Sequence, residues 1–124
     1  MNPEEIVKQI EAAYLTHNIE WLAGFWDPKI VAYFNGRKAH EGRESLLGFQ
    51  REQFESRITD QFKVTLRAAS GSVIALEWEA VFTDKTSGKV QYVYAGAFLT
   101  MRENQLIEWH DYSEFYSEEV GNGE

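Results

Sequence analysis

The chain has 124 residues, 44% of them hydrophobic, and its 12 basic and 20 acidic residues give a formal charge of -8. This length and apolar content are typical of one compact domain, and the negative charge argues against binding to nucleic acid or to a membrane surface. The absence of cysteine excludes disulfides and thiolate metal sites, and no apolar run is long enough to span a bilayer. We expect one cytoplasmic domain over residues 1–120, with residues 121–124 as a frayed tail.

The first half of the chain predicts three helices. Asn2 is a favourable N-cap, Pro3 suits the first helical position, and the apolar residues that follow recur at helical spacing. Asn18 offers the cap of a second, shorter helix that ends at Asp27-Pro28, and residues 42–57 predict the third helix.

Strand patterns fill the rest of the chain. Residues 29–35 are rich in β-forming side chains and end at Asn35-Gly36, a turn that leads to a short second strand. From Gln61 onward, apolar residues alternate with a period of two in four further strands, and the stretches between them have turn composition. Helices segregated from an antiparallel meander predict an α+β fold.

Asp111 is the candidate catalytic residue. It follows Ile107 and Trp109 on the same face of the last strand, whereas His110 points to the opposite face, so that these neighbours cannot form a catalytic dyad without a bulge. A carboxylate buried among apolar groups is costly unless it is paired or protonated. We therefore expect the pKa of Asp111 to lie above its usual value of roughly 3.9.

The order of these elements and three short stretches carry a family resemblance: Gly42-Arg43-Glu44-Ser45, Gly96-Ala97-Phe98 and Ile107-Glu108-Trp109-His110-Asp111-Tyr112. On these features the chain resembles the SnoaL-like group of the nuclear transport factor 2 (NTF2) superfamily. The resemblance implies a cone-shaped α+β fold, in which three N-terminal helices pack in the concavity of a curved, mostly antiparallel sheet.

Two motifs resemble those of limonene-epoxide-hydrolase-like members. In that branch a Trp-x-Asp-Tyr motif supplies a pocket carboxylate, which Trp109-His110-Asp111-Tyr112 matches, and a Tyr-x-Asn motif helps hold the nucleophilic water, which Tyr33-Phe34-Asn35 matches. The same enzymes need an arginine and a second aspartate, and the corresponding positions here hold Trp78 and Ala80. Neither side chain can replace those groups, so we expect no epoxide hydrolysis by that mechanism.

Two other branches are also relevant. The proton-abstracting aspartate of the ketosteroid-isomerase-like branch falls at Asn35, and an amide cannot take up a proton at neutral pH. Tyr14 resembles that branch's phenol donor. The chain is more similar to the polyketide-cyclase-like SnoaL members, in which a pocket aspartate near the end of the last strand acts as acid or base, a role that the resemblance assigns to Asp111.

Strand alternation and the helical stripes also predict a pocket wall. Such a wall suits a flat, apolar ligand with one or two hydrogen-bonding groups. The candidate binding residues are Tyr14, Trp21 and Trp26 from the helices and Tyr33, Asn35, Trp78, Tyr92, Tyr94 and Trp109 from the strands.

Other interpretations of the same residues remain open. Asp111 can cap backbone amides or pair with Arg37 or Arg43, and the aromatic residues can simply fill a core. A one-residue change of register in the first strand would turn both ends of Tyr33-Phe34-Asn35 outward and its middle residue inward.

The outer face of the sheet predicts an assembly. A face exposed to solvent does not need many apolar side chains, whereas two such faces packed together would bury them. We therefore expect a homodimer through the outer sheet face, as the resemblance also implies. The residues expected there are Ala75, Glu77, Glu79, Val81, Val93, Ala95, Ala97, Glu108, His110 and Tyr112.

Three functions are compatible with these observations. The first is acid-base chemistry of an isomerase, cyclase or hydrolase type on a small apolar molecule through Asp111. The second is binding of such a ligand without turnover, and the third is an NTF2-type protein-interaction module. His17, His40 and His110 are dispersed, and we expect neither a metal nor a cofactor.

Overall fold

The computed structural model describes residues 2–117. Its helices are α1 (Pro3–Leu15), α2 (Ile19–Phe25) and α3 (Arg43–Ser56). The predicted caps form, because Asn2 Oδ1 accepts a hydrogen bond from the Glu5 amide at 2.8 Å and Asn18 Oδ1 accepts one from the Trp21 amide at 3.0 Å. The second helix ends at Phe25, before the predicted stop at Asp27-Pro28. The predicted tail, residues 121–124, lies outside the described residues.

One six-stranded sheet contains all the strands of the described residues, which are β1 (Trp26–Phe34), β2 (Arg37–Glu41), β3 (Arg57–Ser70), β4 (Val73–Asp84), β5 (Val90–Arg102) and β6 (Gln105–Ser117). The strand order is β2-β1-β6-β5-β4-β3. Strands β3 to β6 form the predicted antiparallel meander, and β1 pairs with β6 in parallel. The sheet is therefore mostly antiparallel.

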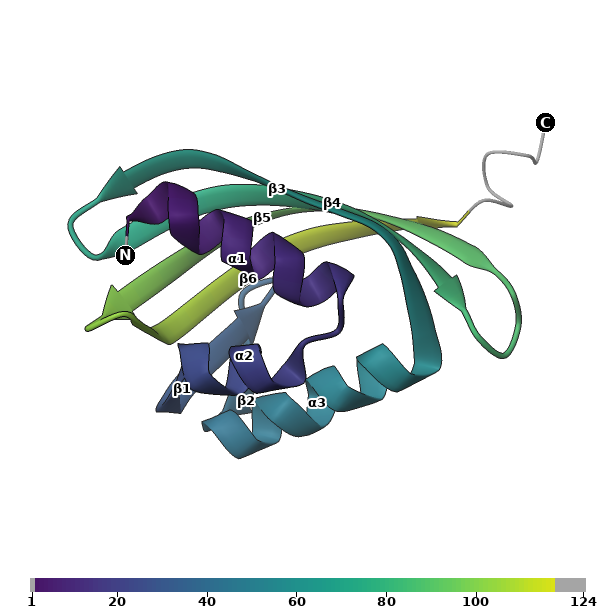
Figure 1. The fold of residues 1–124 in the computed structure, drawn as a ribbon, viewed down its shortest axis with the longest axis horizontal. Helices are drawn as coiled ribbons and strands as arrows, with labels where there is room; N and C mark the ends of the chain where they lie inside the picture. The colour runs from purple at the N-terminus through teal and green to yellow at the C-terminus, as the bar shows by residue number, and fades with distance from the viewer. Residues whose placement is uncertain (1, 118–124) are drawn as a thin grey trace.

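The helices cover one face of this curved sheet. Figure 1 shows the long strands β3 to β6 arching over α1, while α2 and α3 lie further from that arch, next to β1 and β2. Helix α1 packs against β3, and α3 packs against β1. The predicted α+β cone with helices in the concavity of the sheet is confirmed.

The hydrophobic core lies between the helices and the concave face. Its most deeply buried large side chains are Leu22 on α2, Trp26 and Ile30 on β1, and Leu46 on α3. Burial of a side chain of this size stabilises a fold by about 1.5–3 kcal/mol, so these four residues fix α2 and α3 against the sheet. Leu22 and Trp26 also line the cavity described below.

The predicted faces of β5 were wrong. Val93, Ala95 and Ala97 are buried on the concave side, whereas Tyr94 is 52% exposed on the outer face, together with Tyr92 and Phe98. The reason is the size of the neighbouring side chains on the concave side. Ala95 lies opposite the large ring of Trp78, and Ala97 lies opposite Asp111, so that small residues on β5 leave room for both.

Candidate functional site

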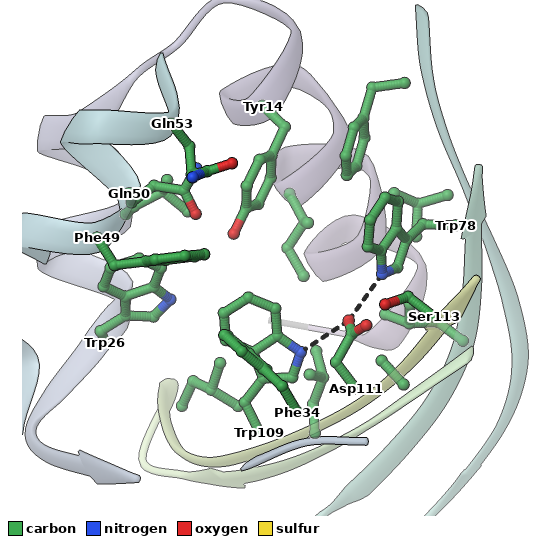
Figure 2. Close-up of a pocket in the computed structure, with 18 of the residues that line it drawn as sticks. Tyr14, Trp26, Phe34, Phe49, Gln50, Gln53, Trp78, Trp109, Asp111 and Ser113 are labelled. Atoms are coloured by element: carbon green, nitrogen blue, oxygen red, sulfur yellow. Dashed lines mark hydrogen bonds between the residues drawn. The ribbon is translucent and has the colours of Figure 1, made fainter. Parts of the chain in front are cut away.

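A cavity of about 390 Å³ lies between the helices and the concave face of the sheet. Its size is within the range of small-molecule sites, which is about 300–1,000 Å³. Figure 2 shows its wall, where side chains from helices and strands converge on a central space. The large aromatic residues of the wall are Tyr14, Phe25, Trp26, Phe34, Phe49, Phe62, Trp78, Phe82, Trp109 and Phe115.

Asp111 lies in this wall and is only 5% exposed. Its Oδ2 accepts two hydrogen bonds, one from Trp78 Nε1 at 2.8 Å and one from Trp109 Nε1 at 3.2 Å (Figure 2). Among residues 2–117, no side chain or backbone group donates to Oδ1, and no cation pairs with the carboxylate. One oxygen is therefore fixed by the protein and the other is left for a ligand.

Burial raises the pKa of Asp111 to about 6, although the hydrogen bonds from Trp78 and Trp109 lower it in part. The desolvation of the charged form is the dominant effect, because two neutral donors on one oxygen do not replace a full hydration shell. Near neutral pH the carboxyl group can therefore both accept and release a proton, as an acid-base catalyst requires.

Tyr14 is the second titratable group that points into the cavity. Its hydroxyl faces the central space from α1, on the side opposite Asp111 (Figure 2), and its ring stacks on Phe62 with 4.8 Å between centroids. Burial raises the pKa of Tyr14 above its ordinary value, and the nearby charge of Asp111 raises it further. The phenol thus stays protonated and can donate a hydrogen bond to a ligand.

Five of the side chains that the sequence predicts for the pocket wall line the cavity, as does Asp111, and four do not. Trp21 stacks on Phe25 with 4.8 Å between centroids but does not reach the cavity. Tyr92 and Tyr94 lie on the outer face of β5, as described above. The five predicted binding residues that line the cavity are Tyr14, Trp26, Asn35, Trp78 and Trp109.

Tyr33 is the fourth incorrect assignment, and it lies on the outer face of β1. Its ring stacks on His110, with 4.4 Å between centroids and an interplanar angle of 4°. Phe34 lies next to Asp111 in the parallel pairing of β1 with β6 and lines the cavity instead. Of the two polar residues in the motif Tyr33-Phe34-Asn35, only Asn35 reaches the cavity.

Asn35 lines the cavity from the turn that follows β1. It has a left-handed backbone conformation with φ of 52°, beyond the end of β1, and its Oδ1 accepts a hydrogen bond from the Ser113 amide at 3.0 Å. Its own amide donates to the Asp111 carbonyl at 2.8 Å. Asn35 thus ties the turn after β1 to the strand that carries Asp111.

Arg43, one of the two alternative partners for Asp111, is engaged elsewhere. Its Nη1 donates to the carbonyls of Ala23 and Trp26 at 3.2 and 3.3 Å, which fixes the start of α3 against the end of α2. The described part of the chain also holds no cluster of three or more His, Asp or Glu side chains that suits a metal ion. Within the same residues, no helix is both long and apolar enough to cross a membrane.

Sequence reasoning missed several polar residues of the wall. Gln50, Gln53 and Arg57 come from the end of α3 and the start of β3, and Ser113 comes from β6. Gln50 gave the only signal in the sequence, because it interrupts the apolar stripe of the third helix. It is 2% exposed, which is unusual for a glutamine without a fixed partner.

Comparison with known proteins places this fold in a family. The protein-family model of the SnoaL-like domain matches residues 7–109 of the sequence. No curated protein sequence matches the chain. Among solved structures, a candidate isomerase from Bacillus subtilis is similar with a TM-score of 0.79 and 16% identity, over 92% of this chain and 90% of that one.

Two further structures are similar over most of their length. A candidate polyketide cyclase from Pseudomonas putida KT2440 has a TM-score of 0.73 and 18% identity, over 90% of this chain and 91% of that one. An LEH-like epoxide hydrolase from M. tuberculosis has a TM-score of 0.70 and 13% identity, over 87% of this chain and 79% of that one. At these low identities the structural matches establish a shared fold and no more. The family model, in contrast, matches most of the sequence. The chain belongs to the SnoaL-like domain family.

Proposed function

We propose that this protein catalyses acid-base chemistry on a small apolar molecule, with Asp111 as the proton carrier. The observation that supports this most directly is the state of the Asp111 carboxyl group. Two indoles hold Oδ2, Oδ1 has no donor among the described residues, and the pKa is raised to about 6 by burial. A carboxylate with a purely structural role would have both oxygens satisfied by the protein.

The reaction class that fits this site is proton transfer at a carbon next to a carbonyl group. Asp111 Oδ1 would remove the proton, and the negative charge would move to the carbonyl oxygen of the ligand. Tyr14, protonated and on the opposite side of the cavity, would donate a hydrogen bond to that oxygen. Return of the proton from Asp111 to another carbon completes an isomerisation. In a cyclisation, the carbanion attacks a second carbonyl carbon, the C=O π bond breaks, and the resulting alkoxide takes the proton back from Asp111.

Epoxide hydrolysis fits this site less well. That reaction needs a second carboxyl group to exchange protons with the first, and Asp111 is the only carboxylate among the described residues that line the cavity. Trp78 donates to Asp111 in a position where the epoxide-hydrolase resemblance expects a guanidinium. An isomerase or cyclase is therefore the better proposal, and candidate isomerases and polyketide cyclases are among the proteins of similar fold.

Hydrogen-deuterium exchange on carbon tests this function without the natural substrate. The probe is 2-tetralone in D2O, followed by NMR, because its acidic C–H groups flank a carbonyl on an apolar ring system. We expect the protein to accelerate exchange above the buffer rate, and Asp111→Asn to abolish the acceleration. Asp60→Asn, which alters an exposed carboxylate on β3, should exchange like the wild type. Equal acceleration by wild type and Asp111→Asn would refute the proposal.

Binding without turnover is the second candidate function. It is favoured by the presence of a single carboxylate in the cavity wall, since many acid-base enzymes use two titratable groups. Saturable binding of 2-tetralone with no exchange above the buffer rate would support this alternative.

We further propose that the protein forms a homodimer through the outer face of the sheet. This face presents aromatic side chains on its central strands, including Tyr94 at 52% and Phe98 at 51% exposure. Phe98 and Tyr112 contact each other edge to face, with 6.4 Å between centroids. A contiguous aromatic surface of this kind is typical of an interface, and a second copy presents the same surface.

A further inference from the structure

One end of the cavity wall carries hydrogen-bond donors without partners. Gln50 and Gln53 are three residues apart on one side of α3, and Arg57 begins β3 immediately after this helix; all three line the cavity. Figure 2 shows the amides of Gln50 and Gln53 on the opposite side of the cavity from Asp111. Within residues 2–117, none of these three side chains forms a hydrogen bond or an ion pair.

Arg57 is the most informative of the three residues. Its guanidinium carbon lies 3.6 Å from the centroid of the Phe82 ring, which fixes the side chain against β4. Its Nε is buried and has no hydrogen-bond acceptor in the described part of the chain. An unsatisfied buried donor on a charged group is costly, and Arg57 also lines the cavity without a carboxylate partner among the described residues.

The carboxylate closest to Arg57 in the sheet register does not neutralise it. Asp84 lies opposite Arg57 in the pairing of β3 with β4, but its Oδ1 accepts hydrogen bonds from the amides of Thr86 and Ser87 in its own turn. Arg57 and Asp111 are the only charged residues among the described lining residues, and they form no ion pair with each other. The positive charge of Arg57 therefore stays available to a ligand.

A second cation lies near this end of the cavity. Burial lowers the pKa of His17, and the charges of Lys85 and Arg57 lower it further. The Lys85 amide donates to the Ser56 carbonyl at 2.9 Å, next to Arg57 in the chain. In a protein with a formal charge of -8, this local positive charge favours an anionic ligand group at the same end.

We propose that the ligand is an apolar carboxylic acid, whose carboxylate is bound by Arg57 and Gln53 and whose ring system fills the aromatic part of the cavity. A guanidinium binds a carboxylate through two parallel hydrogen bonds, and the amide of Gln53 supplies another donor. The carboxylate lies away from Asp111, because two anions in one apolar cavity repel each other. Asp111 then faces the carbon skeleton of the ligand, so this inference rests on the proposed function and names its substrate class.

Matched probes test this inference by binding alone. The probes are 2-naphthylacetate and its methyl ester, which share the ring system and differ in charge. Binding is followed by the fluorescence of the cavity tryptophans or by calorimetry. We expect the wild type to bind the carboxylate at least about tenfold more tightly than the ester, and Arg57→Gln to weaken carboxylate binding by about tenfold to a hundredfold. The affinity for the ester should differ by no more than about twofold between Arg57→Gln and the wild type.

Arg51→Gln is the matched control, because Arg51 lies on α3, six residues before Arg57, but is exposed and does not line the cavity. It should leave both affinities unchanged. Retained binding of the ester shows that Arg57→Gln is folded, and if that variant does not fold, Arg57→Lys should keep a reduced preference for the carboxylate. Equal affinity of the wild type for both probes, equal losses in Arg57→Gln and Arg51→Gln, or no binding of either probe would overturn the inference.

The two proposals fail in different ways. Loss of deuterium exchange with an intact preference for the carboxylate would refute the proposed reaction and support the assignment of Arg57. Exchange that depends on Asp111, together with no preference for the carboxylate, would support the proposed reaction and refute the assignment of Arg57.

Discussion

Trp78 on β4 and Asp111 on β6 are joined by a hydrogen bond of 2.8 Å from the indole Nε1 to the carboxylate Oδ2. A neutral indole stabilises a carboxylate less than an arginine would, because it adds no charge. The two indoles therefore offset only part of the effect of burial, and the pKa of Asp111 stays raised at about 6. The residue that breaks the epoxide-hydrolase pattern therefore keeps Asp111 able to carry a proton at neutral pH.

Trp78→Phe should raise the pKa of Asp111 further, because it removes one of the two hydrogen bonds that stabilise the charged form. The pH at which the deuterium-exchange rate reaches half its maximum should move upward by about one unit, since a hydrogen bond to a charged group contributes roughly 1.5 kcal/mol. Trp21→Phe removes an indole outside the cavity and should not move the profile. An unchanged midpoint in Trp78→Phe would contradict the assignment of Asp111 as the titrating group.

Asp111→Asn should stabilise the protein above pH 7. The folded-state pKa of Asp111 is raised, so the folded state binds its proton more tightly than the unfolded state does. The stability that this group contributes is fully present below about pH 4 and is lost as the pH rises through about 6. The variant avoids this loss, which amounts to about 2–3 kcal/mol at pH 8. Urea denaturation at pH 5 and pH 8 measures the difference between the two proteins, which should grow with pH.

Asp84→Asn should change stability in the opposite direction from Asp111→Asn. The amides of Ser87 and Thr86 lower the pKa of Asp84, so its contribution to stability is present at neutral pH and is lost as the pH falls through the lowered value. Asp84→Asn should therefore be less stable than the wild type at pH 7, with a difference that shrinks in acid. The same pH trend in both variants would mean that a global charge effect, and not the local environment of each carboxylate, controls stability.

The sequence was sufficient for the architecture because caps and periodicity are local. Asn2 and Asn18 accept hydrogen bonds from the first turns of their helices, and the period of two defines the four long strands. Asp111 was identifiable because it is a carboxylate on an otherwise apolar strand face, and burial does raise its pKa. Each of these signals depends on a few neighbouring residues.

The faces of β1 and β5 were not predictable in this way. In both strands each of the two alternating sets contains large apolar side chains, so the period shows which residues lie together but not which set faces the helices. The choice depends on neighbouring strands, as when the small Ala95 lies opposite Trp78 and Phe34 lies beside Asp111. Arg57 was missed because its position in the wall depends on where α3 ends and β3 begins.

Phe34→Ala and Tyr33→Ala test the register of β1. Phe34 lines the cavity and contacts Trp109, with 5.3 Å between ring centroids, whereas Tyr33 stacks on His110 on the outer face. We expect Phe34→Ala to weaken binding of the naphthyl ester by about tenfold, because it removes a large apolar contact worth roughly 1–2 kcal/mol. Tyr33→Ala should leave this affinity unchanged. The reverse pattern would show that the first-strand register is the one expected from the motif.

Phe98→Glu should dissociate the proposed homodimer. Phe98 lies at 51% exposure on the outer face of β5, beside Tyr112, and a dimer through this face would bury both rings. A glutamate at this position would bring a charge from each copy into the contact, where desolvation and repulsion oppose association. Sedimentation velocity at micromolar concentration should show a dimer for the wild type and a monomer for Phe98→Glu. Leu15→Glu places the same charge at an exposed apolar position at the end of α1, on the helix side of the sheet, and should remain dimeric. A monomeric wild type, or equal dissociation in both variants, would rule out this face as the interface.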